Sequence, residues 1–274
     1  MGGSRFVKRL LSSLLAWTLG AADAGTVAAP ALVAIPAGEC PMGAGQSHLG
    51  DHHPKIAEFR LAVHPVTNAE YQRFVLETGH RPPGVGAAEA RFQLWKGTEF
   101  PPEIARQPVV GVSWEDAVKY CQWLSKRTGM KFRLPSEEEW EYAARGGLKG
   151  KPYPAGDKQD GAAAWFGKKW NGAGTLAAAD YGAANGYGLH GMSGNVWQWT
   201  ATWYVPIYDG RPVAEELNLY KVIRGGAWAH TGDFLHVGYR NWAAPAVRDL
   251  YTGFRVAEGP EMPPAPKPDR LGYL

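Results

Sequence analysis

Residues 224–255 read RGGAWAHTGDFLHVGYRNWAAPAVRDLYTGFR, and residues 194–199 upstream read GNVWQW. Glycines open both segments, where they favour tight turns, and tryptophans follow them closely and need a core to pack into. Neither segment contains a cysteine. The two segments predict short strands separated by turns and held together by aromatic packing.

The rest of the chain has the same character. Its 274 residues include 35 Gly, 21 Pro and 12 Trp, and only 20% of them are charged. This composition is typical of a loop-rich protein, and the chain is long enough for one large domain or two small ones. Because no linker or internal repeat is evident, we predict one domain at residues 25–260, followed by a Pro-rich tail at residues 261–274.

The first 24 residues have the pattern of an export signal. Arg5, Lys8 and Arg9 form a basic start, residues 10–22 are apolar but too few to span a bilayer, and residues 22–24 form a small-x-small cleavage site. No cysteine follows that could carry a lipid, and no later run is long and apolar enough to cross a membrane. We expect a periplasmic or secreted protein that is not inserted in the membrane after signal cleavage.

Charge points to no polyanionic partner. Residues 1–24 hold three of the 29 basic residues and one of the 26 acidic ones, so the predicted mature chain carries 26 basic and 25 acidic residues. A near balance gives no broad basic surface for phosphates. We therefore expect no nucleic-acid partner.

Three helices have clear start and stop signals. Each begins at a hydroxyl residue that can cap its N-terminus and ends at a glycine that can close its C-terminus. The three pairs are Thr67 and Gly79, Ser113 and Gly129, and Ser136 and Gly146. In the third helix Trp140, Ala143 and Ala144 share one face, which predicts that this face is buried.

The remaining sequence predicts short strands and long loops. Residues 147–186 are rich in Gly, Ala and aromatic residues without a sustained period, which indicates ordered loops. Strands are predicted at residues 31–36, 58–63, 194–200, 221–225 and 253–257. The predicted fold class is therefore α+β, with helices flanking a small, mostly antiparallel sheet.

Seven motifs occur in a fixed order along the chain. They are IPAGE at 35–39, VTNAEY at 66–71, PVVGVSWEDAVKYCQWL at 108–124, RLPSEEEWEYAARGG at 133–147, NGYGLHGMSGNVWQW at 185–199, VIRGGAW at 222–228 and GFRV at 253–256. Together they resemble the formylglycine-generating enzyme, or sulfatase-modifying factor, family over about residues 33–257. The resemblance implies a single elaborated C-type-lectin-like domain with little regular secondary structure.

The same resemblance implies a copper site that this chain lacks. Catalytic members use two cysteines after the RGG-x-W element to bind copper and oxidise a substrate cysteine to formylglycine. Here the first position falls on His230 and the second on Gly232 or Leu235, and Ala227 replaces the usual hydroxyl residue. None of these residues supplies the thiolate that copper(I) favours. We therefore predict a divergent branch that does not perform ordinary formylglycine generation.

Calcium sites of the family are also altered. The resemblance implies oxygen ligands around residues 194–199, and the carbonyls of Gly194 and Val196 are retained. Gln198 stands where a glutamate is expected, and Gly191 and Ala163 stand where asparagines are expected. Because calcium prefers carboxylates among six to eight oxygens, the sequence predicts a degenerate calcium site at best.

Two histidines lie in the loop where the family performs its chemistry. Imidazole can bind copper or iron, so His230 and His236 are candidate catalytic residues and metal ligands. Their spacing matches no recognised ligand pattern. The alternative is that both are solvated or bonded to the loop.

The resemblance also implies a substrate groove. Arg240 keeps a family position in this groove, which makes it the third catalytic candidate. Trp228, Tyr239 and Trp242 offer aromatic surface for an extended peptide or an aromatic ligand. Packing in the core explains Trp228 equally well. By contrast, Arg133, Glu137 and Glu141 are interpreted as a structural network.

The two cysteines of the chain, Cys40 and Cys121, lie outside this loop. The resemblance implies that the position of Cys121 can pair with a residue just after GFR, which here is Val256. An oxidising compartment would also permit a bridge between Cys40 and Cys121, while buried free thiols are the alternative.

Two classes of function follow. The first is a non-canonical oxidoreductase or maturation factor that acts on a peptide or protein in the periplasm, similar to exported relatives of the pyoverdine-maturation or copper nitrite reductase accessory type. The second is a C-type-lectin-like binding module that keeps the groove without catalysis.

Overall fold

The computed structural model describes residues 28–43, 52–159, 161–204 and 219–260. Within these residues it contains three small β-sheets and three α-helices joined by long loops. The predicted export signal and the Pro-rich tail lie outside these residues. Within them, no helix has the length and apolar character needed to cross a membrane.

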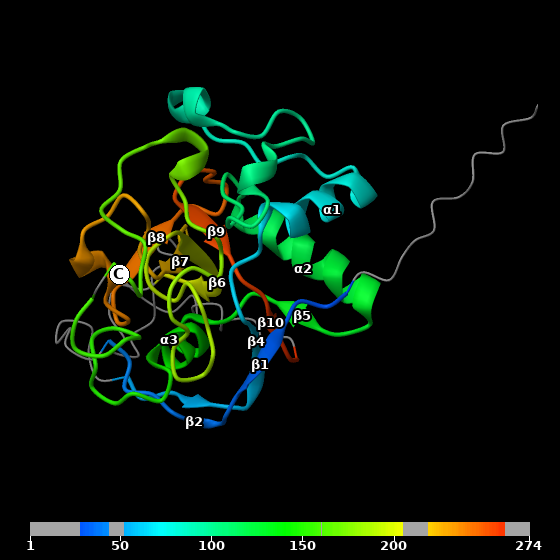
Figure 1. Ribbon diagram of the computed structural model, residues 1–274. Helices are drawn as coiled ribbons and strands as arrows, with labels where there is room; N and C mark the ends of the chain where they lie inside the picture. Colours follow the sequence, from blue (N-terminus) through cyan, green and yellow to red (C-terminus); the bar gives the residue numbers. More distant parts are fainter. Residues whose placement is uncertain (1–27, 44–51, 160, 205–218, 261–274) are drawn as a thin grey trace, which may run out of the picture.

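The first four-stranded sheet is built largely from the GNVWQW segment and from parts of residues 224–255. Its order is β8-β7-β6-β9, and it consists of β6 (Trp197–Trp203), β7 (Lys221–Arg224), β8 (Arg240–Ala243) and β9 (Thr252–Phe254). β6 pairs antiparallel with β7 and parallel with β9, in the register Gln198 to Gly253. Strands that lie far apart in the sequence thus pair in the centre of the molecule (Figure 1).

The second four-stranded sheet joins the two ends of the domain. Its order is β1-β4-β10-β5, formed by β1 (Leu32–Ile35), β4 (Phe59–Ala62), β10 (Ala257–Glu258) and β5 (Phe132–Arg133), all antiparallel. A separate pair consists of β2 (Gly38–Glu39) and β3 (Lys55–Ile56).

The three predicted helices are confirmed, and so are their ends. They are α1 (Asn68–Thr78), α2 (Trp114–Thr128) and α3 (Glu137–Arg145), and each starts with a capping box and ends at a glycine in the left-handed conformation. The described residues also form the 3-10 helices η2 (Ala87–Phe92), η3 (Pro102–Ile104), η4 (Gly172–Gly174) and η6 (Gly232–Leu235).

Two apolar clusters form the core. One packs α1 and α2 against β6 and β9 and includes Tyr71, Leu124 and Trp199. The other surrounds the fully buried Trp140 of α3 and includes Ile35 and Leu61 of the second sheet. α3 thus lies between the two sheets, where Figure 1 shows it below the first sheet.

The α+β class is confirmed, while several strand boundaries differ from those predicted. The strand predicted at 194–200 starts three residues later because Gly194 and Asn195 have φ values of 76° and 64°, outside the extended region. The strand predicted at 253–257 divides into β9 and β10 around Arg255. The single predicted sheet is three sheets, and β8 lies in a stretch where no strand was expected.

Candidate functional site

The loop after β7 is shaped by two glycines. Gly225 and Gly226 have φ values of 102° and 74°, and a Cβ on Gly226 would lie 2.7 Å from Cδ1 of Leu235. Leu235 is fully buried against this turn. The side chain at one candidate second-cysteine position therefore packs inside the loop and is not presented to a ligand.

His230 lies in an aromatic enclosure in this loop. Its ring is 4.8 Å from Phe234, 5.4 Å from Trp197 and 6.2 Å from Tyr251, measured between centroids. Its Nδ1 is buried and has no hydrogen-bond partner in the described structure. Burial lowers the pKa of His230 below its usual value, although the Ala227 carbonyl and Asp249 act in the opposite direction. Burial therefore favours the neutral form of this imidazole.

Further rings extend this enclosure into an aromatic row, defined here as Trp170, Trp228, Tyr251, His230, Phe234 and Tyr239. Consecutive centroids in the row are between 4.8 and 6.2 Å apart. Trp228 is only 4% exposed and stacks on Tyr251. Trp228 is therefore a core residue, in agreement with the alternative that core packing explains it.

His236 lies in a different environment. Its Nδ1 accepts a hydrogen bond from the Gly238 amide at 3.0 Å, and its ring contacts Tyr153. Burial and then Arg145 lower its pKa. Among the described residues, no three His, Cys, Asp or Glu side chains form a group that could hold a metal. The donor set around His230 and His236 therefore does not fit a copper or iron centre.

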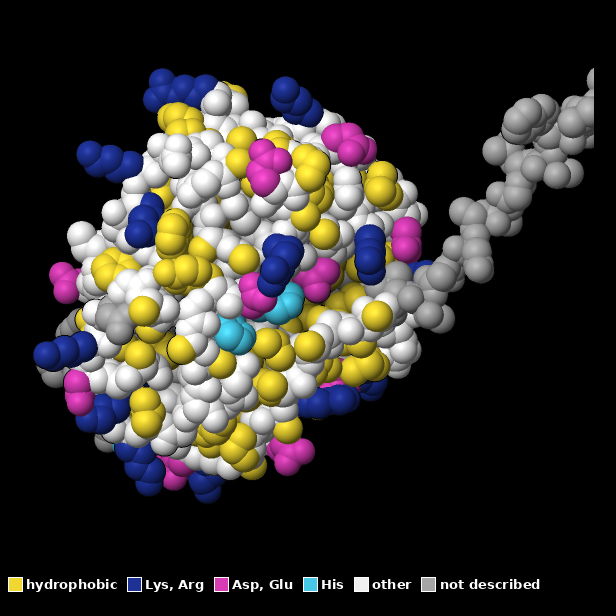
Figure 2. Space-filling view, in the orientation of Figure 1, with side chains coloured by type: hydrophobic (Ala, Val, Ile, Leu, Met, Phe, Trp, Pro, Cys, Tyr) yellow, Lys and Arg dark blue, Asp and Glu magenta, His cyan; other side chains and the backbone are white. Residues whose placement is uncertain are grey.

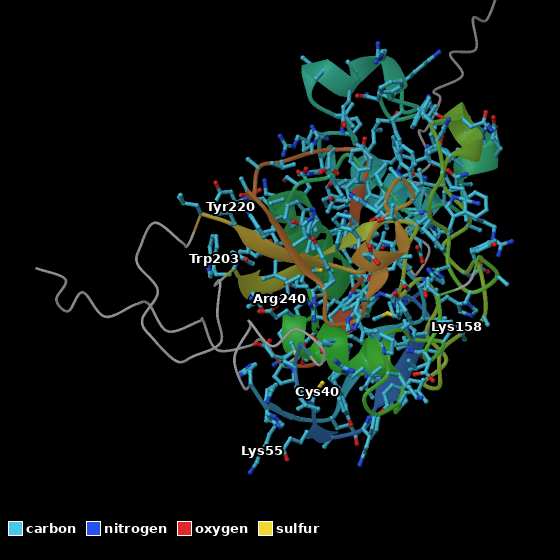
Figure 3. All side chains as sticks on the ribbon, turned by 90° about the vertical axis from the view of Figure 1, so that its left-hand side faces the viewer. Cys40, Lys55, Lys158, Trp203, Tyr220 and Arg240 are labelled. Carbon is cyan, nitrogen blue, oxygen red and sulfur yellow. The ribbon has the colours of Figure 1, made fainter. Side chains whose placement is uncertain are left out.

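Arg240 is committed to a buried ion pair. Its Nε and Nη2 donate to the two carboxylate oxygens of Glu137, both at 2.8 Å, and its guanidinium lies 5.0 Å from the centre of the Tyr204 ring. Figure 3 shows Arg240 between the first sheet and α3. Of the aromatic residues proposed beside it, Trp242 is 46% exposed and stacks on Tyr204. The positive charge of Arg240 is thus neutralised by the carboxylate of Glu137.

A second buried ion cluster confirms the structural role of α3. Glu141 accepts from Arg145 at 2.5 Å, from Arg224 of β7 and from the Gly43 amide. Arg133 makes a bidentate salt bridge with Glu139, in which Nη1 and Nη2 each donate to one carboxylate oxygen at 2.7 Å. These carboxylates bind the sheets and the N-terminal segment to α3.

The residues at the expected calcium site bind one another. Gln198 accepts from Trp140 Nε1 at 2.9 Å and from Arg255 Nε at 2.6 Å, and it donates to the Gly191 carbonyl at 2.6 Å. The carbonyl of Gly194 accepts from the amide of Val196. Because a buried guanidinium touches the amide that replaces the expected carboxylate, this site does not fit calcium.

Cys40 and Cys121 are free, buried thiols in the two different apolar clusters. Burial raises the pKa of Cys40 to about 11 and raises that of Cys121 further. The bridge left open by the sequence does not form.

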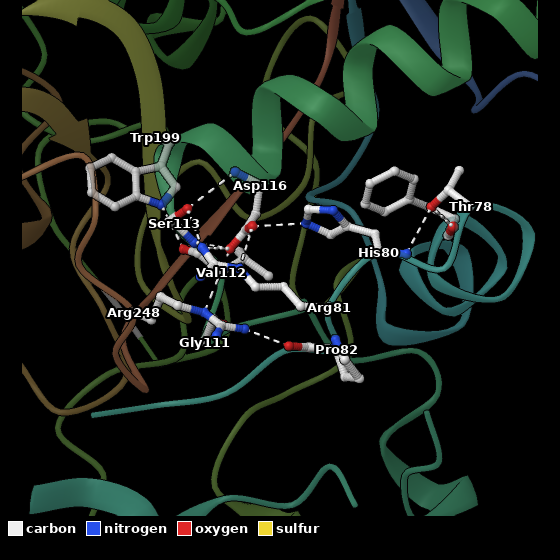
Figure 4. A network of polar contacts seen from close by, with 11 residues as sticks. Thr78, His80, Arg81, Pro82, Gly111, Val112, Ser113, Asp116, Trp199 and Arg248 are labelled. Atoms are coloured by element: carbon white, nitrogen blue, oxygen red, sulfur yellow. Dashed lines mark hydrogen bonds and ion pairs between the residues drawn. The ribbon is translucent and has the colours of Figure 1, made fainter. Parts of the chain in front are cut away.

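A polar cluster that sequence reasoning missed surrounds Asp116 at the start of α2 (Figure 4). Asp116 accepts from His80 Nε2 at 2.8 Å and from Arg81 at 3.0 and 3.1 Å, and Arg248 lies 3.5 Å away. Burial acts to raise the pKa of Asp116, but bonds from Arg81, the Ser113 amide and His80 hold it below its usual value. In the sequence Asp116 stands three residues after Ser113, but its side-chain partners come from distant segments.

The molecular surface agrees with a nearly balanced charge. On the face shown in Figure 2, Lys and Arg side chains are interspersed with Asp and Glu.

Helices around small sheets, a glycine-shaped loop after β7 and motifs in a fixed order define a single domain of the formylglycine-generating-enzyme type without thiols in its central loop. A family model described as "Sulfatase-modifying factor enzyme 1-like domain" matches residues 20–260. The chain belongs to this family.

Known proteins similar to this chain differ in length. The serine/threonine-protein kinase Pkn1 of Chlamydia trachomatis is 32% identical over 243 residues, which are 83% of this chain and only 38% of that kinase. The "Inactive C-alpha-formylglycine-generating enzyme 2" of Bos taurus is 31% identical over 85% of this chain and 89% of its own. The solved structure of PvdO from Pseudomonas aeruginosa has a TM-score of 0.71 and 30% identity, and the match covers 84% of this chain and 94% of PvdO.

Proposed function

We propose that this protein is an exported, non-canonical oxidoreductase that matures a peptide or protein in the periplasm, using His230 in place of a copper–thiolate centre. The observation that carries the proposal is the neutral imidazole of His230, with a buried, unpaired Nδ1, enclosed by aromatic rings at the position of the first copper-binding cysteine. The leader-like first 24 residues support a location outside the cytoplasm, and the sequence resemblance to exported maturation factors supports the role.

The chemistry assigned to His230 is that of a general base. A neutral imidazole can accept a proton from a group of the bound peptide. The substrate then gives two electrons and a second proton to dissolved dioxygen, and dioxygen with both protons becomes hydrogen peroxide. No step requires a metal, in keeping with the donor set of the described residues.

The test combines metal analysis with turnover. The purified protein is incubated with a synthetic peptide mixture in air, and peptides that lose the mass of two hydrogens are identified together with hydrogen peroxide. His230→Ala abolishes this reaction, whereas His64→Ala, which replaces a half-buried histidine bonded to the Pro65 carbonyl, leaves it unchanged. Stoichiometric copper or iron that is lost in His230→Ala would overturn the metal-free reaction.

A non-catalytic binding module is the second candidate. Leu235, Arg240 and Gln198 stand at family functional positions and are all engaged in packing or internal bonds. The bovine relative that covers most of this chain is likewise named inactive. Peptides that are retained by the protein but remain chemically unchanged in air would favour this function.

A further inference from the structure

A pocket between residues 154–163 and 183–193 has no role in the chemistry described above. It has a volume of about 330 Å³, which falls within the usual range for ligand pockets. Leu189, Met192 and Ser193 in its wall are buried, whereas Ala184 is exposed. The pocket is therefore a partly open cavity with a buried floor and room for an organic ligand.

The pocket borders the region where the family resemblance implies calcium. Ala163 and Gly191, which stand where asparagines are expected, both line it, and neither has a side-chain oxygen for an ion. Figure 3 shows Lys158, the neighbour of Gln159 in the pocket wall, on the other side of the molecule from Trp203 and Tyr220. The pocket is thus remote from that end of the first sheet.

Asn185 holds the pocket wall in place. Its Nδ2 donates to the carbonyls of Ala143 and Ala144 at 2.8 and 3.1 Å, and its Oδ1 accepts from the amides of Tyr187 and Leu189. These bonds use both donors and both lone pairs of the amide and attach the wall to the end of α3. Binding therefore does not require this wall to become ordered, which favours affinity.

Gln159 offers the pocket a hydrogen-bond acceptor. Ser193 Oγ donates its proton to the Leu235 carbonyl at 3.0 Å, so it can only accept from Gln159, whose Nε2 lies 2.9 Å away. This arrangement orients the amide of Gln159 and leaves its Oε1 without a hydrogen bond to any residue that the structure describes. A ligand that complements Gln159 therefore carries a proton donor.

The main chain at the pocket mouth also has free polar groups. Within the described part of the chain, the amides and carbonyls of Ala183 and Ala184 form no hydrogen bonds, and both residues are exposed. Alternating N–H and C=O groups can pair with the main chain of another peptide. Among the described residues that line the pocket, none carries a charge. The mouth therefore suits a peptide, and the interior suits an uncharged side chain.

We propose that this pocket binds a short peptide segment, with its main chain on Ala183 and Ala184 and a carboxamide side chain that donates to Gln159 Oε1. The aliphatic groups of Leu189 and Met192 cover the carbon atoms of that side chain. A carboxylate of the same shape has no proton for Oε1 and is buried without a partner. The inference rests on the proposed function only for the choice of a peptide as the ligand.

The probes are three acetylated tripeptide amides, Ala-Gln-Ala, Ala-Glu-Ala and Ala-Ala-Ala, titrated by NMR into the full-length protein at neutral pH. The glutamine peptide shifts the methyl signal of Met192 in the pocket floor. The glutamate and alanine peptides bind about tenfold more weakly, because each leaves the acceptor of Gln159 without a donor.

Two variants with matched controls locate the binding. Gln159→Ala removes the acceptor and lowers the affinity for the glutamine peptide to that for the alanine peptide, whereas Gln122→Ala, at an exposed position of α2, leaves it unchanged. Ala184→Phe fills the mouth and abolishes binding, whereas Ala88→Phe, at an exposed position of η2, does not. Circular dichroism and thermal melting establish that the variants are folded.

Three results would overturn the inference: no binding of the glutamine peptide at millimolar concentration, equal affinity for the glutamine and glutamate peptides, or unchanged affinity in folded Ala184→Phe. The outcome is distinguishable from that of the proposed function. Binding of the glutamine peptide by a protein that oxidises no peptide would leave this inference standing and remove the proposed reaction. Oxidation of peptides by a protein that does not bind the probe would do the reverse.

Discussion

At the position where the family resemblance implies a calcium-binding carboxylate, Gln198 makes three hydrogen bonds and connects α3, the Gly191 turn and Arg255. Arg255 is completely buried, and burial lowers its pKa to about 9. An amide suits this place because it can accept from the guanidinium and donate to the carbonyl at once. The Gln198 side chain thus connects the segments that the family resemblance would have a calcium ion connect.

Calcium should not stabilise this protein. We expect the same melting temperature in excess calcium chloride and in EDTA, because the potential ligands are bonded to each other. Gln198→Ala should lower the free energy of unfolding by about 3 kcal/mol, since it leaves three buried polar groups without partners. Gln159→Ala, which loses one half-buried bond to Ser193, should cost less than about 1 kcal/mol. A clear rise in melting temperature with calcium would contradict this account.

Both thiols should be inert in the folded protein. Cys40 and Cys121 are 1% and 2% exposed, and burial raises the pKa of each. We expect Ellman's reagent to detect no thiol until guanidinium unfolds the chain, and then to detect both without prior reduction. Detection of both thiols only after a reductant is added would instead indicate a disulfide.

At the scale of elements, α3 is the common support of both sheets. Glu137 holds Arg240 of β8, and Glu141 holds Arg224 of β7, all at buried positions. The helix itself is not long, and its position depends on these ion pairs and on Trp140. Loss of one carboxylate therefore affects the sheet as much as the helix.

Glu137→Gln should be strongly destabilising. The substitution leaves the buried guanidinium of Arg240 without its carboxylate, and breaking such a pair costs about 3–5 kcal/mol. Glu138→Gln, next in sequence, removes a half-buried contact with His52 at 3.8 Å and should cost less than about 1 kcal/mol. Urea unfolding measures both variants, and equal effects would argue against a special role for Glu137.

The helices could be predicted from the sequence because their signals are local. A capping hydroxyl, an acidic residue three positions later and a closing glycine all lie within one short segment. β8 gave no such signal, because Arg240 and Asn241 interrupt any apolar alternation and the strand is defined by its pairing with β7. The same holds for the candidate site. The absence of thiols could be seen in the sequence, but the ion pair of Arg240 could not be predicted because Glu137 lies 103 residues away.

At the scale of the whole molecule, Asp116 connects three distant segments. It caps α2, receives His80 and Arg81 from the segment after α1, and lies against Arg248 from the segment before β9. These contacts join residues that lie up to 168 positions apart in the sequence, from His80 to Arg248. The cluster therefore holds together segments that the order of the sequence keeps apart.

The Asp116 cluster should contribute to acid unfolding. Because the pKa of Asp116 is held below its ordinary value of 3.8 in the folded protein, its stabilisation is present above that value and is lost as pH falls through the lower folded pKa. Asp116→Asn should lower the free energy of unfolding by about 3 kcal/mol at neutral pH and show a weaker acid dependence.

Asp180→Asn is the matched control for that measurement. Asp180 pairs with Arg106 at an exposed position, so its substitution should change the stability by less than about 1 kcal/mol at any pH. Urea unfolding at several pH values distinguishes the two variants. Parallel pH curves for the wild type and Asp116→Asn would show that this carboxylate does not control acid stability.

β10 lies between β4 and β5 in the second sheet, although it is the last strand of the described chain. The edges of β4 and β5 that face each other are therefore unpaired until residues 257–258 are in place. A ribosome or a translocation channel that still holds the C-terminal part would keep the domain open, so its assembly must be a late event. Shortening the chain before Ala257 should consequently block folding altogether and not merely trim a loose end.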